Sequence, residues 1–310
     1  MTEPTNIKIN KEQHMNIKHL VISGGGPSGF IAYGAAKHLA KAGIWSVKNL
    51  KSIYGCSIGA FLAVLFSLDY DWDWLDDYIM KRPWDKVFAP ALSAHEAWTQ
   101  KGVISEKIVM DVLAPLLTAK ELTSDVTLAE LFAYNHIEIH IFTSNINSPI
   151  IEKVDLSYKT HPHLTVVKAL CMSMAYPLAF RPMYHEGNCY IDGGLLNNYP
   201  LKDCLEHQEG CVAEEILAFR NVYVNTDVDG KNELCTDETP LIDFIAHIIR
   251  KMYLTISTEE RQPKVPYTVR CIIENMEGFQ NWFIAYQNRG QVIEKGCTQG
   301  KLFLEYINNV

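Results

Sequence analysis

The segment Gly55-Cys56-Ser57-Ile58-Gly59 fits the pattern G-x-S-x-G and lies where a predicted strand turns into a helix. A nucleophilic serine needs this setting, because the turn is tight and strained and its flanking positions leave almost no room for side chains. The turn presents the serine hydroxyl at a helix N-terminus, where the helix dipole favours developing negative charge. The pattern therefore predicts that Ser57 is a nucleophile, with Gly55 and Gly59 shaping the turn. A glycine-rich turn with an incidental serine is the alternative.

A second glycine-rich stretch, "SGGGPSGF" at 23–30, follows the first predicted strand. A serine hydrolase needs backbone N–H groups aimed at the oxyanion of its tetrahedral intermediate, and consecutive glycines let amides point the same way. Pro27 has no N–H, so we expect the donors among Gly25, Gly26 and Ser28. The residues assigned to this oxyanion hole are Gly24, Gly25, Gly26, Ser28 and Gly29.

The same loop also fits the dinucleotide-binding pattern G-x-G-x-x-G, through Gly24, Gly26 and Gly29. A dinucleotide site needs an acidic residue about 20 residues further on, to bind the ribose hydroxyls. The sequence has no acidic residue between Glu12 and Asp69. A nucleotide-binding oxidoreductase therefore stays open only as an alternative.

A nucleophilic serine also needs a base. Asp192 ends the predicted strand of "CYIDGG", and Gly193 and Gly194 let the chain turn so that the carboxylate approaches Ser57. A common Asp-Gly turn is the alternative. His207 and His247 follow Asp192 in the order typical of a Ser-Asp-His triad, but both lie in predicted helices, where surface or packing histidines are the simpler interpretation.

Around these motifs, apolar runs alternate with segments of helical period. This alternation is typical of an α/β fold, so we expect three layers, α/β/α, with a mostly parallel central sheet. Strands are expected at 19–23, 50–54, 136–146, 189–192, 215–224 and 267–273. Helices are expected at 27–42, 58–67, 164–176 and 240–260, over most of 71–135, and from about residue 283.

Composition restricts the partners and the location. The net charge of −8 argues against nucleic acid, because binding phosphates needs a basic face. The eight cysteines form no C-x-x-C pair, and the polar N-terminus lacks the apolar core of a signal peptide, so we expect a cytoplasmic protein.

We expect a tail at 1–17 and one domain at 18–310. His161-Pro-His163 has no accompanying ligands, so neither a metal nor a cofactor is expected.

Taken together and in this order, the motifs G-G-G-x-x-G, G-x-S-x-G and D-G-G resemble the patatin-like phospholipase family. "MSMAYPLAFRP" (172–182) resembles the small-residue helix of that family, and "NNYP" (197–200) resembles its Asn-x-Pro. The resemblance covers the core motifs at about 18–205. It implies a patatin-like fold and a dyad of Ser57 and Asp192 that works without histidine. One position departs from the family: Ser28 stands where the family usually carries Arg or Lys.

The resemblance implies a lipid acyl hydrolase of the phospholipase A or lysophospholipase type. Its substrates would be phospholipids or related acyl esters, cleaved through an acyl-enzyme on Ser57 without a cofactor. An acyltransferase using the same serine is the main alternative, and a non-catalytic lipid-binding protein is another. The sequence leaves the oligomeric state open.

The segment 69–104 holds four of the six tryptophans, at 72, 74, 84 and 98. Tryptophan suits a membrane interface, so this segment is a candidate lid or peripheral membrane contact. Ordinary core aromatics are the alternative.

Overall fold

The computed structural model describes residues 15–88, 98–208, 210–224, 235–256, 263–274 and 288–309. The first elements are β1 (His19–Ile22), η1 (Gly26–Ser28), α1 (Gly29–Lys41), η2 (Val47–Asn49), β2 (Ser52–Cys56), α2 (Ile58–Ser67), α3 (Trp72–Lys81), α4 (Trp84–Phe88), β3 (Gly102–Ile104), α6 (Glu106–Thr118) and α7 (Leu128–Asn135). The rest are β4 (Glu138–Asn145), β5 (Glu152–Leu156), α8 (Val166–Ser173), β6 (Leu178–Phe180), β7 (Met183–His185), β8 (Asn188–Asp192), α9 (Gly194–Asn197), α10 (Leu201–His207), η4 (Ala213–Glu215), β9 (Ile216–Val224), α11 (Leu241–Ile256), β10 (Tyr267–Glu274) and α13 (Arg289–Asn309).

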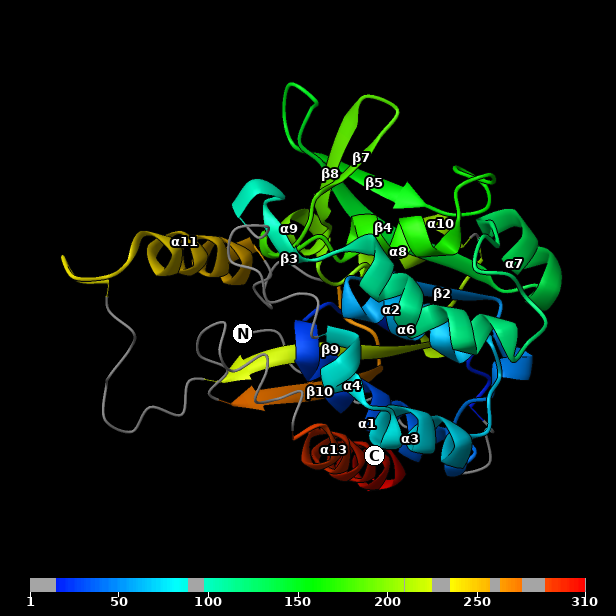
Figure 1. Cartoon of the computed structure of the whole chain (residues 1–310). Coiled ribbons are helices and arrows are strands. Elements are labelled where there is room, and N and C mark those ends of the chain that lie inside the picture. Colours follow the sequence, from blue (N-terminus) through cyan, green and yellow to red (C-terminus); the bar gives the residue numbers. More distant parts are fainter. Residues whose placement is uncertain are drawn as a thin grey trace.

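An eight-stranded sheet runs through the middle of the molecule, with helices on both sides (Figure 1). The strand order is β10-β9-β1-β2-β4-β8-β7, and β5 pairs with β4 beside this row. The strands from β10 to β4 are parallel, whereas β5 and β8 run antiparallel to β4, and β7 runs antiparallel to β8. Because parallel strands end at the same edge, the loops after β1 and β2 lie next to each other.

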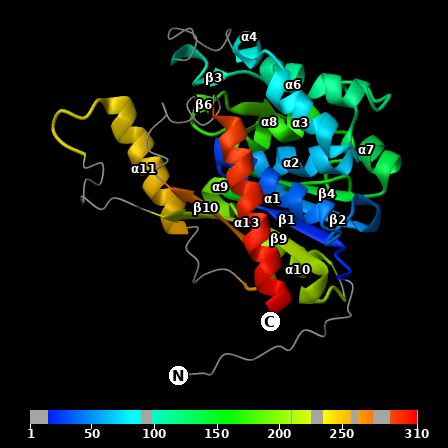
Figure 2. The ribbon, with the colours of Figure 1, turned by 90° about the horizontal axis from the view of Figure 1, so that it is seen from below.

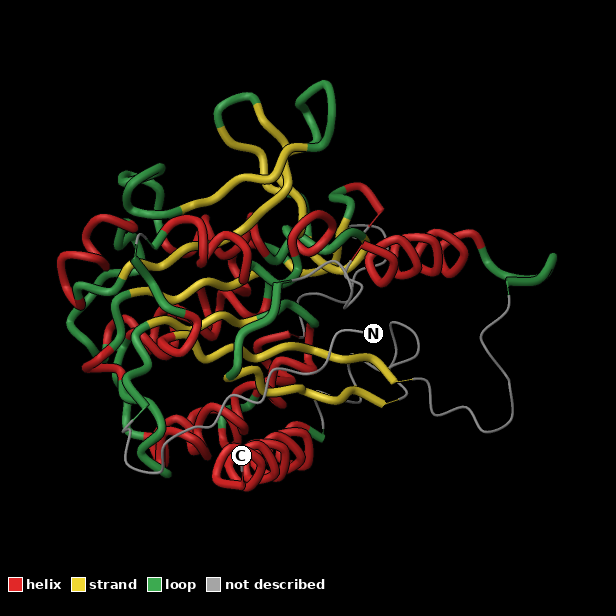
Figure 3. The backbone as a smooth tube through the Cα atoms, turned by 180° about the vertical axis from the view of Figure 1, so that it is seen from behind, coloured by secondary structure: helices red, strands yellow, loops and turns green. Residues whose placement is uncertain are grey.

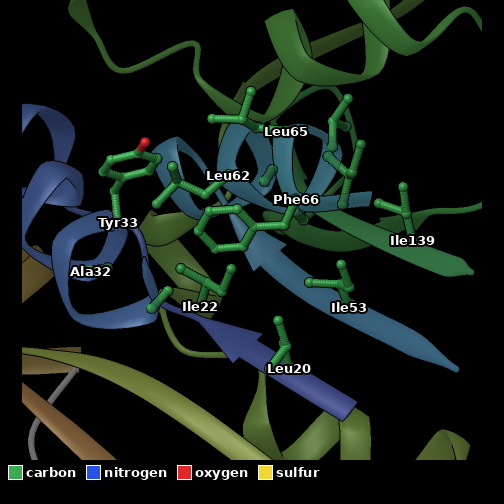
Figure 4. Packing of buried hydrophobic residues seen from close by; sticks show 14 of the residues in the cluster. Leu20, Ile22, Ala32, Tyr33, Ile53, Leu62, Leu65, Phe66 and Ile139 are labelled. Carbon is green, nitrogen blue, oxygen red and sulfur yellow. The ribbon is translucent and has the colours of Figure 1, made fainter. Parts of the chain in front are cut away.

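The two faces of the sheet bury alternate side chains. Leu20, Ile22 and Ile53 face α1 and α2 and belong to the larger core, which Figure 4 shows from close by. Val21 and Tyr54 point to the opposite face, where Leu201 and Cys204 of α10 complete a smaller core. Each fully buried aliphatic side chain contributes roughly 1.5–3 kcal/mol of transfer free energy, so the larger core anchors β1 and β2.

The C-terminal helix α13 lies along α1, as Figure 2 shows. Its residues Ile293, Phe303 and Ile307 are buried, and Cys297 lies against the carbonyl oxygen of Gly34 in α1. The helix that follows β10 is therefore part of the layer that covers β1, and it holds in place the helix that follows the glycine-rich loop.

The expected three-layer fold with a mostly parallel sheet is confirmed, and Figure 3 shows its strands between helices. All six expected strands form, each within two residues of its expected ends. The sequence analysis missed β3, β5, β6 and β7, because three of them have only three residues and β5 begins with exposed side chains. The expected tail falls mostly in 1–14, and parts of the expected helices fall in 257–260 and 283–287; these lie outside the described residues.

Two of the four tryptophans at 69–104 pack within the fold. Trp72 packs edge-on against Tyr33, with ring centroids 5.7 Å apart, and Trp84 is buried and donates its indole N–H to the carbonyl of Ile79. Trp74 is 42% exposed and stacks on a neighbouring tyrosine, whereas Trp98 is 75% exposed. Residues 89–97 lie outside the described part. None of the described helices combines the length and the apolar character needed to cross a membrane.

Candidate active site

Ser57 lies on the turn between β2 and α2 with a backbone φ of 54° and ψ of −122°, an unusual conformation for a non-glycine residue. In this turn α2 starts very close to two strands, and the glycines on either side of Ser57 make this approach possible. A Cβ at Gly55 would lie 2.4 Å from the carbonyl oxygen of Gly59, and a Cβ at Gly59 would lie 2.3 Å from that of Ile22. Both contacts are with backbone, which cannot move aside, so any larger residue at either position would deform the turn.

Hydrogen bonds from α8 hold the turn in place. The amide of Ser57 donates to the hydroxyl oxygen of Ser173 at 2.9 Å, and that hydroxyl donates to the carbonyl of Phe142 at 2.6 Å. Ser173 therefore connects the turn to β4. The sequence analysis did not single out this residue, although it lies within the stretch 172–182 that resembled the family.

Asp192 is buried at the end of β8, where the Ser57 hydroxyl lies close enough to its carboxylate to influence its pKa. The amide of Gly194 donates to Asp192 Oδ1, at 2.8 Å. Burial raises the pKa of Asp192 to about 6, while the Ser57 hydroxyl and the Gly194 amide act in the opposite direction. A carboxylate with this pKa is a better base than an exposed aspartate and is still ionised at neutral pH.

The backbone around Asp192 is fixed by the segment that follows α8. The amide of Asp192 donates to the carbonyl of Ala175 at 3.0 Å, and that of Gly193 donates to the carbonyl of Ser173 at 3.3 Å. Gly193 also lies directly against the backbone of Phe142. Ser173 and Phe142 thus contact both the D-G-G motif and the serine turn. The positions of Ser57 and Asp192 therefore depend on the same residues.

The glycine-rich loop lies against the serine turn, since a Cβ at Gly24 would be 3.2 Å from the Cβ of Ser57. The amide of Gly24 donates to the carbonyl of Asn198, that of Ser28 to the carbonyl of Gly25, and that of Gly29 to carbonyls within η1. No hydrogen bond among the described residues uses the amides of Gly25 or Gly26.

Two asparagines that the sequence analysis did not assign to the site support this loop. The side-chain amides of Asn198 and Asn221 both donate to the carbonyl of Gly24, at 3.2 and 2.8 Å, and the amide of Asn221 donates to the Ser23 hydroxyl oxygen at 2.8 Å. Asn198 belongs to the "NNYP" segment. For Asn221 the available signal was a pair of polar residues, Arg220 and Asn221, inside a mostly apolar strand.

Ser28, the position that departs from the family pattern, is buried and donates its hydroxyl to the carbonyl of Gly25 at 2.5 Å. The side chain therefore closes the loop on itself. Tyr253 of α11 covers the other side of the site: its ring lies against Gly194, and its hydroxyl donates to Asn198 Oδ1. Burial raises the pKa of Tyr253 well above its usual value, so its hydroxyl stays protonated.

The histidines considered for a triad lie elsewhere. Across the described ranges, no histidine forms a hydrogen bond or ion pair with Ser57 or Asp192. His207 lies on α10 beside His140 and Asp155, and His247 is half-buried on α11. Among the described residues, therefore, neither catalytic candidate has a histidine partner.

Within the part of the chain that the structure describes, two groups of side chains have the composition of a metal site, and neither includes a catalytic candidate. The first is His19, Cys211 and Glu215, in which the His19 ring already bonds to the Ser52 hydroxyl at 2.7 Å. The second is His140, Asp155 and His207. His161 of the H-x-H sequence bonds to the neighbouring Thr160 instead.

Comparison with known proteins agrees with this geometry. Residues 20–205 match the family model described as patatin-like phospholipase. The chain is 28% identical over 259 residues to the uncharacterized protein R571 of Acanthamoeba polyphaga mimivirus, covering 80% of this chain and 78% of that protein. It is 25% identical over 194 residues to the probable lipid hydrolase 463L of Invertebrate iridescent virus 6, covering 61% of this chain and 64% of that protein.

Among solved structures, VipD from Legionella pneumophila is similar, with a TM-score of 0.53 and 14% identity. The match covers 94% of this chain and 67% of VipD. At this identity the likeness concerns the fold alone.

Proposed function

The chain belongs to the patatin-like phospholipase family and is a lipid-hydrolysing esterase, and on that premise we propose that it cleaves acyl esters of phospholipids or lysophospholipids through a Ser57–Asp192 dyad. The observation that carries this proposal is the buried carboxylate of Asp192, which lies near the hydroxyl of a serine on a strained turn and has its pKa raised to about 6 by burial. A base of this kind takes the proton of the hydroxyl as its oxygen attacks the ester carbonyl.

In the proposed first half-reaction, Ser57 Oγ forms a bond to the carbonyl carbon and Asp192 accepts the hydroxyl proton. The tetrahedral intermediate then collapses, and Asp192 returns the proton to the departing lyso-product. This leaves an acyl-enzyme. In the second half-reaction Asp192 takes a proton from water, whose oxygen forms a bond to the acyl carbon. The bond between that carbon and Ser57 Oγ then breaks, Asp192 returns the proton to Ser57, and the fatty acid leaves.

We assign the oxyanion donors to the amides of Gly25 and Gly26. Of the loop residues expected to contribute, Gly24, Ser28 and Gly29 already donate their amides to protein carbonyls. The two remaining amides are consecutive, and the loop that carries them lies against Ser57. Amides that are already in place before the reaction stabilise the oxyanion without reorganisation.

A fluorophosphonate probe tests the nucleophile, because it labels an activated serine covalently. We expect labelling of wild type and of the control Ser148→Ala, and none of Ser57→Ala. A panel of phospholipids and lysophospholipids, with products identified by mass spectrometry, then defines the ester that is cleaved. Hydrolysis that persists in purified Ser57→Ala would refute the dyad. Transfer of the acyl group to an added alcohol in preference to water would favour the acyltransferase.

Peripheral membrane contact is part of the proposal, and we place it on α11. This helix exposes Leu241, Phe244, Ile248 and Met252 on a surface that continues to Tyr253, which touches the catalytic loop. Exposed apolar residues beside a lipid-cleaving site suit insertion into the acyl boundary of a bilayer. The cytoplasmic location stays a prediction.

Co-sedimentation with phosphatidylcholine vesicles tests this placement. We expect a double variant, Phe244→Ser with Ile248→Ser, to bind more weakly than wild type. The variant Trp98→Ala probes the tryptophan-rich segment instead. If only the tryptophan variant lost binding, the contact would lie on that segment and not on α11.

A further inference from the structure

A second cluster of reactive side chains lies on the face of the sheet that α10 covers. His140 of β4, Asp155 of β5 and His207 of α10 each offer a ligand atom, and these atoms lie within 4.8 Å of one another. Asp155 Oδ2 is 2.8 Å from His140 Nδ1 and 3.8 Å from His207 Nδ1. Three separate elements therefore bring two imidazoles and a carboxylate to one point.

The hydrogen bonds within the cluster leave some of its buried polar atoms without a partner. His140 Nε2 and Asp155 Oδ1 are buried and have no hydrogen-bond partner among the described residues. The His140 side chain is only 3% exposed. Most buried polar atoms in proteins have a partner, so Asp155 Oδ1 leaves this carboxylate with an unused acceptor beside the two imidazole rings.

We propose that His140, Asp155 and His207 form a binding site for one divalent zinc ion. Imidazole nitrogen and carboxylate oxygen are ligands that zinc prefers. With bonds of about 2.0–2.1 Å, a tetrahedral ion holds its ligand atoms about 3.3 Å apart. The two distances from Asp155 Oδ2, 2.8 and 3.8 Å, lie on either side of this value, so the contacts of Asp155 need shifts of only about 0.5 Å.

The surroundings of His140 fit a ligand that binds through Nδ1. Its proton then resides on Nε2, which faces Glu138 Oε2 at 3.6 Å. Glu138 is itself held by Lys159 at 2.8 Å and by Gln208 at 3.2 Å, and the His140 ring stacks on Tyr54 with centroids 4.2 Å apart. A carboxylate behind a ligating histidine fixes its tautomer and orientation, as is usual in zinc sites.

The site is open on one side, because the His207 side chain is 38% exposed. An ion can enter there, and water can occupy the fourth position. Ser57 and Asp192 are not among its residues, so the ion is structural: it ties β4 and β5 to α10. Since α10 begins at Leu201, three residues after Asn198, the ion also anchors the C-terminal end of the segment that supports the glycine-rich loop.

Zinc titration of the full chain tests the proposal. After removal of metals with a chelator, we expect isothermal calorimetry to give one zinc ion per chain. Cobalt added instead should give the visible absorption of a tetrahedral site. At a free zinc concentration of about 100 times Kd, the Tm should rise by about 5 °C.

The variant His207→Ala is the decisive one, because its half-exposed ring can be removed with little change to the fold. We expect it to weaken zinc binding at least about 100-fold and to abolish the rise in Tm. A double variant, His161→Ala with His163→Ala, is the control for binding to surface histidines and should bind zinc like wild type. Absence of stoichiometric binding, equal titrations of wild type and His207→Ala, or loss of binding in the control would each overturn the proposal. The outcome is independent of the esterase activity.

Discussion

Two carboxylates on adjacent strands of the sheet, Asp192 at the end of β8 and Glu138 at the start of β4, lie in opposite environments. Around Asp192 the neighbouring groups are neutral, namely the Gly194 amide, the Cys56 thiol and the Ser57 hydroxyl, and burial raises its pKa to about 6. Around Glu138 lie the His140 ring and then Lys159 and Gln208, which lower its pKa to about 2. The first environment favours the protonated carboxyl group, as expected of the proposed base, and the second favours the charged carboxylate.

The difference shows how one sheet gives different surroundings to a carboxylate that is proposed to react and to one that holds neighbouring elements together. A carboxylate that must accept a proton is kept away from cations and is destabilised by burial. A carboxylate that must hold neighbouring elements is given cationic partners and partial contact with water. Substitutions of these two acids should therefore change the free energy of unfolding in opposite directions. Five predictions test the contrast.

The largest effect is expected in catalysis. Asp192→Asn should lower kcat/KM for ester hydrolysis by more than about 10³-fold, because the amide cannot accept the serine proton. Asp76→Asn is a matched control, since Asp76 pairs with Lys37 on a different part of the surface. Steady-state assays of both purified variants measure the effect. Activity of Asp192→Asn within tenfold of wild type would remove Asp192 from the mechanism.

The same substitution should stabilise the fold. Asp192 binds its proton with a pKa of about 6 when folded and 3.8 when unfolded, so its ionisation opposes folding as pH rises from about 4 to 6. At pH 7 Asp192→Asn should raise the free energy of unfolding by up to about 3 kcal/mol, and below about pH 4 the gain should vanish. Urea unfolding at both pH values measures it. A destabilised variant at pH 7 would contradict the assigned environment.

Removing a hydrogen bond that holds the glycine-rich loop should lower activity less than replacing Asp192 does. Asn221→Ala removes the donor that lies 2.8 Å from the carbonyl of Gly24 and leaves only the longer bond from Asn198. We expect kcat to fall about 30-fold with little change in KM, since amide donors to an oxyanion act in the transition state. Asn147→Ala, on an exposed loop, is the control. A change confined to KM would point to substrate binding instead.

The pH dependence of the reaction should report the ionisation of Asp192. The base works only when deprotonated, so kcat/KM should be constant above pH 7 and fall about tenfold per pH unit below about 6. A neutral ester substrate avoids ionisation of the substrate itself. A profile with no inflection between about pH 5 and 7 would exclude Asp192 as the base.

The smallest effect is expected from substitution of Glu138, the second of the two carboxylates compared above. Glu138 has a pKa of about 2 when folded and 4.5 when unfolded, so its stabilisation is present above about pH 4.5 and is lost as pH falls towards 2. Because the group is partly exposed, Glu138→Gln should cost only about 1 kcal/mol at pH 7. Unfolding in the presence of a chelator measures it, with the exposed Glu152→Gln as control. A more stable Glu138→Gln would break the contrast between the two acids.

The sequence predicted the parts of the fold and site that depend on neighbours in the chain. The serine turn needs glycines two residues before and two after Ser57, and the strands next to it are continuous apolar runs, so spacing and composition were sufficient. The short strands β6 and β7 escaped prediction because three residues carry no clear period. Ser173 and Asn221 escaped because their partners lie 116 and 197 residues away in sequence.

By itself, therefore, the sequence determined the α/β alternation, the order of the three glycine-containing motifs and the candidate pair of Ser57 and Asp192. Only the tertiary structure decided which loop amides already have partners, how far the pKa of Asp192 rises, and that His140, Asp155 and His207 meet at one point. The physical reason is that a turn is set by local sterics, whereas burial, hydrogen-bond partners and clusters of distant side chains exist only after the strands have paired and the helices have packed.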